Sequence, residues 1–314
     1  MGSVFTATND QVNTYLAKLP ARANVRLVTP MKNLLLSFIL PLIPAAGFAA
    51  GVDFHEHLGI QMWSLRDIAK TDEIKALDQA KAYGFVEIEA GKPAKVPLDQ
   101  YVAAVKQRGF DVVGIHAGYE ALGGDLADVI ATAKALGAHY IVCPWIPHPK
   151  EGLSVAQAHK VAADFDTWGK AIHAAGLQFG WHPHGFEFVK AADGGQSPFE
   201  IVVSETQSEN LVLEMDVFWV FHAGQDPVAL LEKYGDRWQL MHVKDIRKGA
   251  VTHLSTGSAP PTDNVPVGSG QIDWLAVLST AEKVGVKHFF IEDETPAPLQ
   301  CIPASLKYLH GLKL

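Results

Sequence analysis

The 314-residue chain carries 26 Lys and Arg against 34 Asp and Glu, a formal net charge of −8 with histidine counted as neutral. This acidic balance argues against a nucleic-acid-binding surface, which needs clustered basic residues. A hydrophobic content of 48% with 19% charged residues is typical of a soluble, enzyme-like domain. Only two cysteines occur, Cys143 and Cys301, so we expect no disulfide framework.

The first 50 residues differ from the rest in pattern. Residues 1–30 lack a sustained apolar period, and we interpret them as an upstream mis-start or an added sequence. Residues 31–50 are typical of a secretory signal peptide: Lys32 precedes an apolar run over 34–44, and small residues follow. The run is too short for a comfortable membrane span, although an N-terminal anchor is the alternative. We therefore predict translation from Met31, cleavage near Ala49 or Ala50, a periplasmic or secreted protein, and no membrane association after cleavage.

The remaining residues, 51–314, alternate short β-like runs with helical segments, which favours an α/β fold with a parallel sheet. Helical spacing is found over 98–109, 124–136, 154–175, 226–234 and 273–284. Eight units in one domain predict a single (β/α)8 TIM barrel, with a doubly wound open sheet as the alternative. The longest irregular stretch, 245–270, is expected to be a functional loop. The predicted strands are 58–63, 85–89, 112–116, 140–145, a run ending at 181–182, 211–216, 239–244 and 288–292.

Titratable or aromatic residues follow nearly every predicted strand from the second onward. In a barrel these strand ends meet at one face, where active sites lie. Four of them combine imidazole with carboxylate, a set that suits one divalent ion such as Mn²⁺, Co²⁺, Zn²⁺ or Mg²⁺. An ion of this kind can polarise a sugar carbonyl and stabilise an enediolate while a neighbouring residue moves a proton. The predicted metal ligands are His182, Asp216, His242 and Glu292.

Each of these residues also has a purely structural interpretation. Asp216 could cap a following helix, His242 could be a hydrogen-bonded core histidine, and Glu292 could belong to a solvated acidic turn. Their joint occurrence at the ends of neighbouring strands favours the metal site. Glu214 shares the strand parity of Asp216 and should also point inward, without an assigned role. Glu87 and Glu89 share a parity too, and we expect one of them to contact substrate.

Several motifs resemble the sugar phosphate isomerase/epimerase family of xylose-isomerase-like TIM barrels, in a branch that is secreted. The resemblance covers roughly residues 57–312. The motifs are LGIQMWSLR at 58–66, GFVEIE at 84–89, WHPHGFEF at 181–188, MDVFWV at 215–220, AGQDP at 223–227, HVKD at 242–245 and VGSGQIDW at 267–274.

The resemblance implies a single divalent metal held by the ends of strands five to eight. Asp216, His242 and Glu292 match ligands of the ketose 3-epimerases, whereas His182 stands where those enzymes have a ligating Glu. Because that Glu is also half of their acid/base pair, we name Glu187, Glu292 and His184 as acid/base candidates. The expected substrate-binding residues are His116, Trp63, Trp145, Glu89, Trp219, which replaces a histidine of the epimerases, and Lys244.

The leading hypothesis is a metal-dependent sugar isomerase or epimerase that abstracts a proton α to a carbonyl through a metal-stabilised enediolate. One alternative is a lyase or hydrolase of 3-keto-glycosides that shares this first step, and another is a non-catalytic periplasmic carbohydrate-binding protein. An endonuclease role is disfavoured by the acidic charge. The expected partner is a small sugar or keto-glycoside; whether the chain forms a homo-oligomer stays open.

Overall fold

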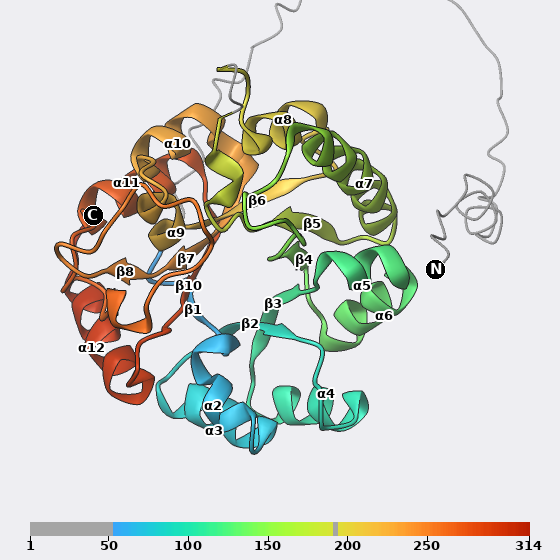
Figure 1. Ribbon diagram of the computed structural model, residues 1–314. Helices are drawn as coiled ribbons and strands as arrows, with labels where there is room; N and C mark the ends of the chain where they lie inside the picture. The colour runs from blue at the N-terminus through green and yellow to red at the C-terminus, as the bar shows by residue number, and fades with distance from the viewer. Residues whose placement is uncertain (1–52, 191–193) are drawn as a thin grey trace, which may run out of the picture. The chain divides into compact units, whose positions relative to one another are not determined.

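The computed structural model describes residues 53–190 and 194–314, and within these ranges eight parallel strands close into a barrel in the order β1-β10-β7-β6-β5-β4-β3-β2 (Figure 1). Pairing of the first strand with the last excludes the open sheet and confirms the (β/α)8 barrel. The predicted segments 1–30 and 31–50 lie outside the described residues. The barrel strands are β1 (Leu58–Gln61), β2 (Glu87–Gly91), β3 (Asp111–His116), β4 (Tyr140–Cys143), β5 (Gln178–Trp181), β6 (Val212–Asp216), β7 (Trp238–Val243) and β10 (His288–Ile291).

Helices surround the barrel (Figure 1). The predicted helices are present with ends displaced by a few residues, and their caps explain where they begin. Ser154, for example, forms a capping box with Gln157 at the start of α7. In the described ranges no helix is both long and apolar enough to cross a bilayer. The α-helices are α2 (Arg66–Ala69), α3 (Glu73–Ala82), α4 (Leu98–Gln107), α5 (Tyr119–Gly124), α6 (Leu126–Leu136), α7 (Val155–Ala174), α8 (Pro198–Glu205), α9 (Val217–His222), α10 (Pro227–Tyr234), α11 (Trp274–Val284) and α12 (Pro298–Gly311).

The barrel interior changes from apolar to polar along its strands. Val212, Leu240 and Phe290 belong to one buried apolar cluster. Because alternate residues of a strand face the same side, the next inward positions on β6 and β7 are Glu214 and His242. Asp216 and Glu292 follow at the strand ends. The carboxyl-terminal part of the barrel interior therefore holds polar side chains, and the apolar cluster lies next to them toward the strand starts.

Asp245 anchors the segment that follows β7. Its carboxylate accepts hydrogen bonds from the backbone N–H of Gly268 (2.9 Å) and Gly270 (3.0 Å) and from the indole N–H of Trp274 (2.9 Å). A Cβ at Gly270 would lie 2.1 Å from a carboxylate oxygen of Asp245, so this approach requires glycine. The stretch predicted as irregular also contains two short antiparallel strands, β8 (Asp245–Ile246) and β9 (Asn264–Val265). The HVKD and VGSGQIDW motifs are therefore joined by hydrogen bonds that stabilise the fold.

We expect Asp245→Ala to lower the free energy of unfolding by about 3 kcal/mol, because several buried donors lose a charged acceptor. Denaturant unfolding would measure the loss. Asp273→Ala is the matched control: Asp273 caps α11 through one exposed bond to the Ala276 N–H, and its removal should cost about 1 kcal/mol. Equal losses in the two variants would contradict the anchoring role.

Candidate metal centre and active site

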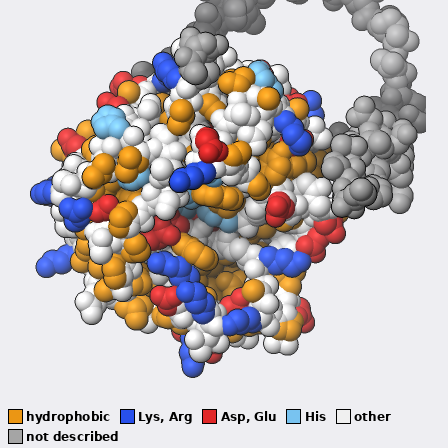
Figure 2. Space-filling view, in the orientation of Figure 1, with side chains coloured by type: hydrophobic (Ala, Val, Ile, Leu, Met, Phe, Trp, Pro, Cys, Tyr) orange, Lys and Arg blue, Asp and Glu red, His pale blue; other side chains and the backbone are white. Residues whose placement is uncertain are grey.

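A cleft of about 860 Å³ opens at the carboxyl ends of the barrel strands. Figure 2 shows this face, with a central hollow bordered by histidine, acidic and hydrophobic side chains and with Lys and Arg gathered below it. Glu292, at the end of β10, lines the cleft and is itself mostly buried. The other predicted site residues that line the cleft are Trp63, His116, Trp145, His182, His184 and Trp219.

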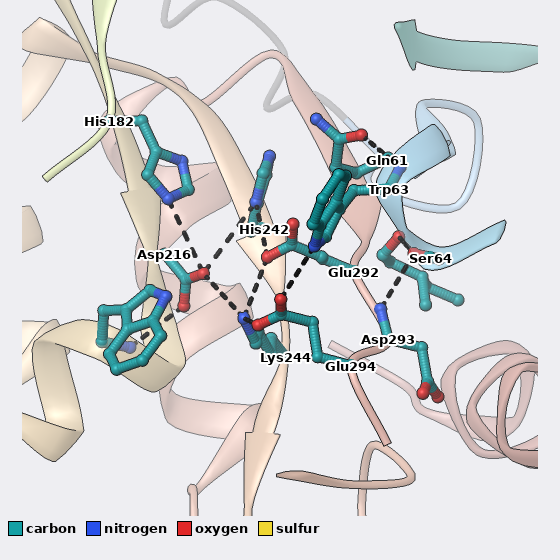
Figure 3. Close-up of polar contacts among 12 residues, drawn as sticks. Gln61, Trp63, Ser64, His182, Asp216, His242, Lys244, Glu292, Asp293 and Glu294 are labelled. Carbon is teal, nitrogen blue, oxygen red and sulfur yellow. Dashed lines mark hydrogen bonds and ion pairs between the residues drawn. The ribbon is translucent and has the colours of Figure 1, made fainter. Parts of the chain in front are cut away.

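His182, His242 and Lys244 lie around one oxygen of Asp216, and Glu292 contacts His242 and Lys244 (Figure 3). The Oδ2 atom of the fully buried Asp216 carboxylate has no hydrogen-bond partner. It lies 3.8 Å from Nε2 of His182 and 3.9 Å from Nδ1 of His242. Nδ1 of His242 is in turn 3.4 Å from Oε2 of Glu292. Ligand atoms of a tetrahedral ion with bonds of about 2.0–2.2 Å lie roughly 3.4 Å apart. Asp216, His242 and Glu292 each offer an atom within 4.8 Å of the other two and so fit one divalent ion, whereas His182 also belongs to a second candidate group with His116, Glu214 and His242.

Two buried carboxylates orient the imidazoles of His182 and His242. Glu89 lies 2.7 Å from Nε2 of His242, and Glu214 lies 2.8 Å from Nδ1 of His182. Each carboxylate accepts the N–H of its histidine, which directs the other ring nitrogen toward Asp216. Histidines that bind metals are commonly held in this way. Glu89 itself has room because Gly114 is its neighbour: a Cβ there would lie 3.2 Å from Glu89 Oε1.

His116 neutralises the two orienting carboxylates. Its Nε2 lies 3.0 Å from Glu89 and 3.1 Å from Glu214. Burial alone would lower the pKa of His116, but the two carboxylates outweigh it and raise that pKa to about 10. Protonated His116 lowers the pKa of Glu89 against the effect of burial, whereas burial and the neighbouring Glu89 still raise the pKa of Glu214 to about 7.

The ligand group itself carries excess negative charge. Burial raises the pKa of Asp216 to about 6. Against the opposing effect of burial, the pKa of Glu292 is held well below its usual range by Lys244 and His242, and the pKa of His242 is raised by Glu214 and Glu292. Without another cation, His242 thus keeps a second proton on Nδ1. A divalent ion would replace that proton as the balancing charge.

We expect Glu214→Gln to weaken divalent-ion binding about 10–100-fold, because loss of an orienting carboxylate has effects of this size. Isothermal titration of the chelator-treated protein would measure the affinity. Glu205→Gln is the control, since Glu205 forms an exposed ion pair with His159. An unchanged affinity in Glu214→Gln would mean that His182 does not depend on this carboxylate.

Three predicted roles need correction. Glu89 is fully buried beneath the ligand group and contacts His242 and His116, so it orients histidine and does not face substrate. Glu187 accepts hydrogen bonds from the His184 N–H at 3.1 and 3.2 Å, which directs it into its own loop. Burial raises the pKa of Glu187 to about 8. Lys244 is 2% exposed, so its predicted contact with substrate is replaced by bonds to carboxylates.

Lys244 acts on the site through charge. Its Nζ donates to Glu292 at 3.0 Å and also contacts Glu294. It lies 3.7 Å from Asp216 Oδ2 and 5.1 Å from the centre of the Trp219 ring. The ammonium therefore holds the carboxylates in place from one side (Figure 3).

Sequence reasoning assigned no role to Glu214 or Glu294. Parity placed Glu214 inside the barrel, yet only the fold shows that its partner is His182. Glu294 lines the cleft and accepts the indole N–H of Trp63 at 2.9 Å. Trp63 and Glu294 lie at opposite ends of the chain, so their contact could be inferred only from the closed barrel and not from sequence spacing.

Residues 77–312 match the family of xylose isomerase-like TIM barrels, which is about three quarters of the chain. The chain belongs to this family. Inosose dehydratase of Lacticaseibacillus casei is 24% identical over 190 residues, 54% of this chain; the match spans only 61% of that relative's length.

Among solved structures of this fold, a sugar phosphate isomerase/epimerase from Parabacteroides distasonis superposes with a TM-score of 0.66 at 21% identity, covering 82% of this chain and 98% of that one. IolI, solved with a bound zinc atom, superposes with a TM-score of 0.59 at 16% identity, covering 81% of this chain and 96% of that one. At these identities the likeness establishes the fold alone. The function of this xylose isomerase-like barrel is therefore inferred from the geometry of its candidate ligands.

Proposed function

We propose that this protein is a metal-dependent sugar isomerase or epimerase that abstracts a proton α to a carbonyl. The observation that carries the proposal is Oδ2 of Asp216, which is buried without a hydrogen-bond partner, lies near Nε2 of His182 and Nδ1 of His242, and belongs to one candidate ligand group with His242 and Glu292. A divalent ion held there would polarise the carbonyl of a bound sugar and stabilise the negative charge that forms on its oxygens. Mn²⁺, Co²⁺, Zn²⁺ and Mg²⁺ remain the candidates.

Glu292 is the proposed base. It lines the cleft, and Lys244 and His242 keep its carboxylate ionised at neutral pH. An ionised carboxylate beside the substrate can accept the α proton and return it to another position. His184 is the second acid/base candidate: it lines the same cleft, and its Nδ1 has no hydrogen-bond partner in the described structure.

Two tryptophans give the cleft its sugar-binding character. Trp63 and Trp145 are 53% and 41% exposed, and both line the cleft. Exposed aromatic faces beside polar groups suit the apolar C–H surfaces of sugars. We propose a small sugar or keto-glycoside as substrate, and we propose that the protein acts after export, as residues 31–50 predict.

Elimination is a second candidate reaction. The relative named inosose dehydratase favours it, because loss of water or of an aglycone next to a carbonyl begins with the same proton abstraction. Incubation with free and 3-keto sugars in D₂O, followed by NMR, would separate the outcomes. Deuterium at a C–H position of an epimer or isomer supports the leading proposal, and an unsaturated carbonyl product with loss of water or aglycone supports the lyase. Sugar binding without exchange by the metal-loaded protein would favour a carbohydrate-binding role.

A further inference from the structure

A second group of metal-ligating side chains lies at the opposite end of the barrel from the cleft. His57 precedes β1, Glu87 begins β2 and His288 begins β10, so all three stand at the starts of neighbouring strands. Nδ1 of His57 lies 2.8 Å from one oxygen of Glu87, and Nδ1 of His288 lies 2.8 Å from the other. One carboxylate therefore holds two imidazoles that come from opposite ends of the chain.

The arrangement matches the donor set of a borderline divalent ion. One ligand atom of each residue lies within 4.8 Å of the other two, and the imidazole planes are 85° apart with centroids separated by 5.2 Å. Two histidines and a carboxylate form a common protein site for zinc, in which the remaining position is left open. The side chains of His57, Glu87 and His288 are 37%, 10% and 17% exposed, so the group is shielded but not sealed.

Solvent reaches the group from one side. A cavity of about 350 Å³ borders His288, and its lining also includes Asp111, His139 and His173. Water from this cavity could complete the coordination of an ion. The cavity is lined by residues at or near the starts of β3, β4 and β5, so it is separate from the cleft formed by the strand ends.

The position of the group gives an ion there a structural role. β1 and β10 pair in the register Leu58 with Phe289 and Gly59 with Phe290, which closes the barrel between its first and last strands. We propose that His57, Glu87 and His288 form a second binding site for a borderline divalent cation such as Zn²⁺, which links β10, β1 and β2 where the barrel closes. Because such an ion binds the folded state only, it raises the melting temperature.

The test is zinc titration of the full chain, free of any histidine tag and treated with chelator, followed by calorimetry and thermal unfolding. Asp216→Ala removes the cleft site, and we expect this variant to retain one zinc equivalent and a zinc-dependent rise in melting temperature. Adding Glu87→Gln should abolish both. His57→Gln, at a partly exposed position, serves if Glu87→Gln does not fold. His159→Gln, which breaks an exposed His–Glu pair, should change neither.

Different results would refute the two proposed metal sites. If the wild type and Asp216→Ala each bind one zinc ion, and Glu87→Gln abolishes that binding, the cleft site is refuted and the second site stands. If folded Asp216→Ala binds no zinc, or if its zinc binding persists in both the Glu87→Gln and His57→Gln backgrounds, the second site is refuted. The three residues would then be only a hydrogen-bonded tie between strands.

Discussion

Asp216→Ala is expected to abolish divalent-ion binding in the cleft and to lower catalysed proton exchange by about 10³-fold. The expected size follows from several kcal/mol of carbonyl polarisation lost with the ion, at about 1.4 kcal/mol for each factor of ten. Oδ2 of Asp216 has no hydrogen-bond partner and lies 3.8 and 3.9 Å from nitrogens of His182 and His242, so its removal deletes a central ligand atom of the proposed site. Calorimetric titration and deuterium incorporation would measure the two losses.

Asp216 also caps α9 through a bond to the Trp219 N–H at 3.0 Å, so part of any effect could come from the helix. Removing a cap costs about 1 kcal/mol of stability. Asp226→Ala removes the equivalent cap of α10, where Asp226 accepts the Val228 N–H, and provides the matched control. Loss of activity in Asp226→Ala comparable with that in Asp216→Ala would assign the effect to folding.

Glu292→Gln is expected to lower the rate of proton exchange by about 10²–10⁴-fold, the usual contribution of a general base. The amide keeps the shape of the side chain but cannot take up a proton, and it also removes one charge from the ligand group. Deuterium incorporation under saturating metal would isolate the loss of the base from weaker ion binding.

Glu187→Gln is the discriminating comparison for that prediction. Glu187 is buried and bonded to the backbone of its own loop. Burial raises its pKa to about 8, so it is largely protonated at neutral pH and glutamine mimics that form. We expect less than a threefold change. A larger loss in Glu187→Gln than in Glu292→Gln would make Glu187 the base and contradict our assignment.

The fold could be predicted because its signal is periodic. Apolar strands alternated with capped helices, and the strand ends carried His182, Asp216, His242 and Glu292, which the barrel brings together. Strand parity was sufficient for this purpose, since parallel strands end at one face.

The supporting contacts could not be predicted from one sequence. Glu89 and Glu214 were recognised as inward-facing, but their roles depend on which histidine lies across the barrel, at 2.7 and 2.8 Å. The orientation of Glu187 was not predicted, because a carboxylate three residues from His184 can turn back onto its own backbone. Such local hydrogen bonds compete with outward-facing roles and leave no distinct sequence pattern.

The most direct test of the central claim is the number of divalent ions bound by the wild type and by Asp216→Asn, which keeps the helix cap and loses the charge. Calorimetric titration of both chelator-treated proteins measures it without knowledge of the substrate. We expect the variant to bind one equivalent fewer than the wild type. Equal stoichiometry and affinity in the two proteins would contradict it.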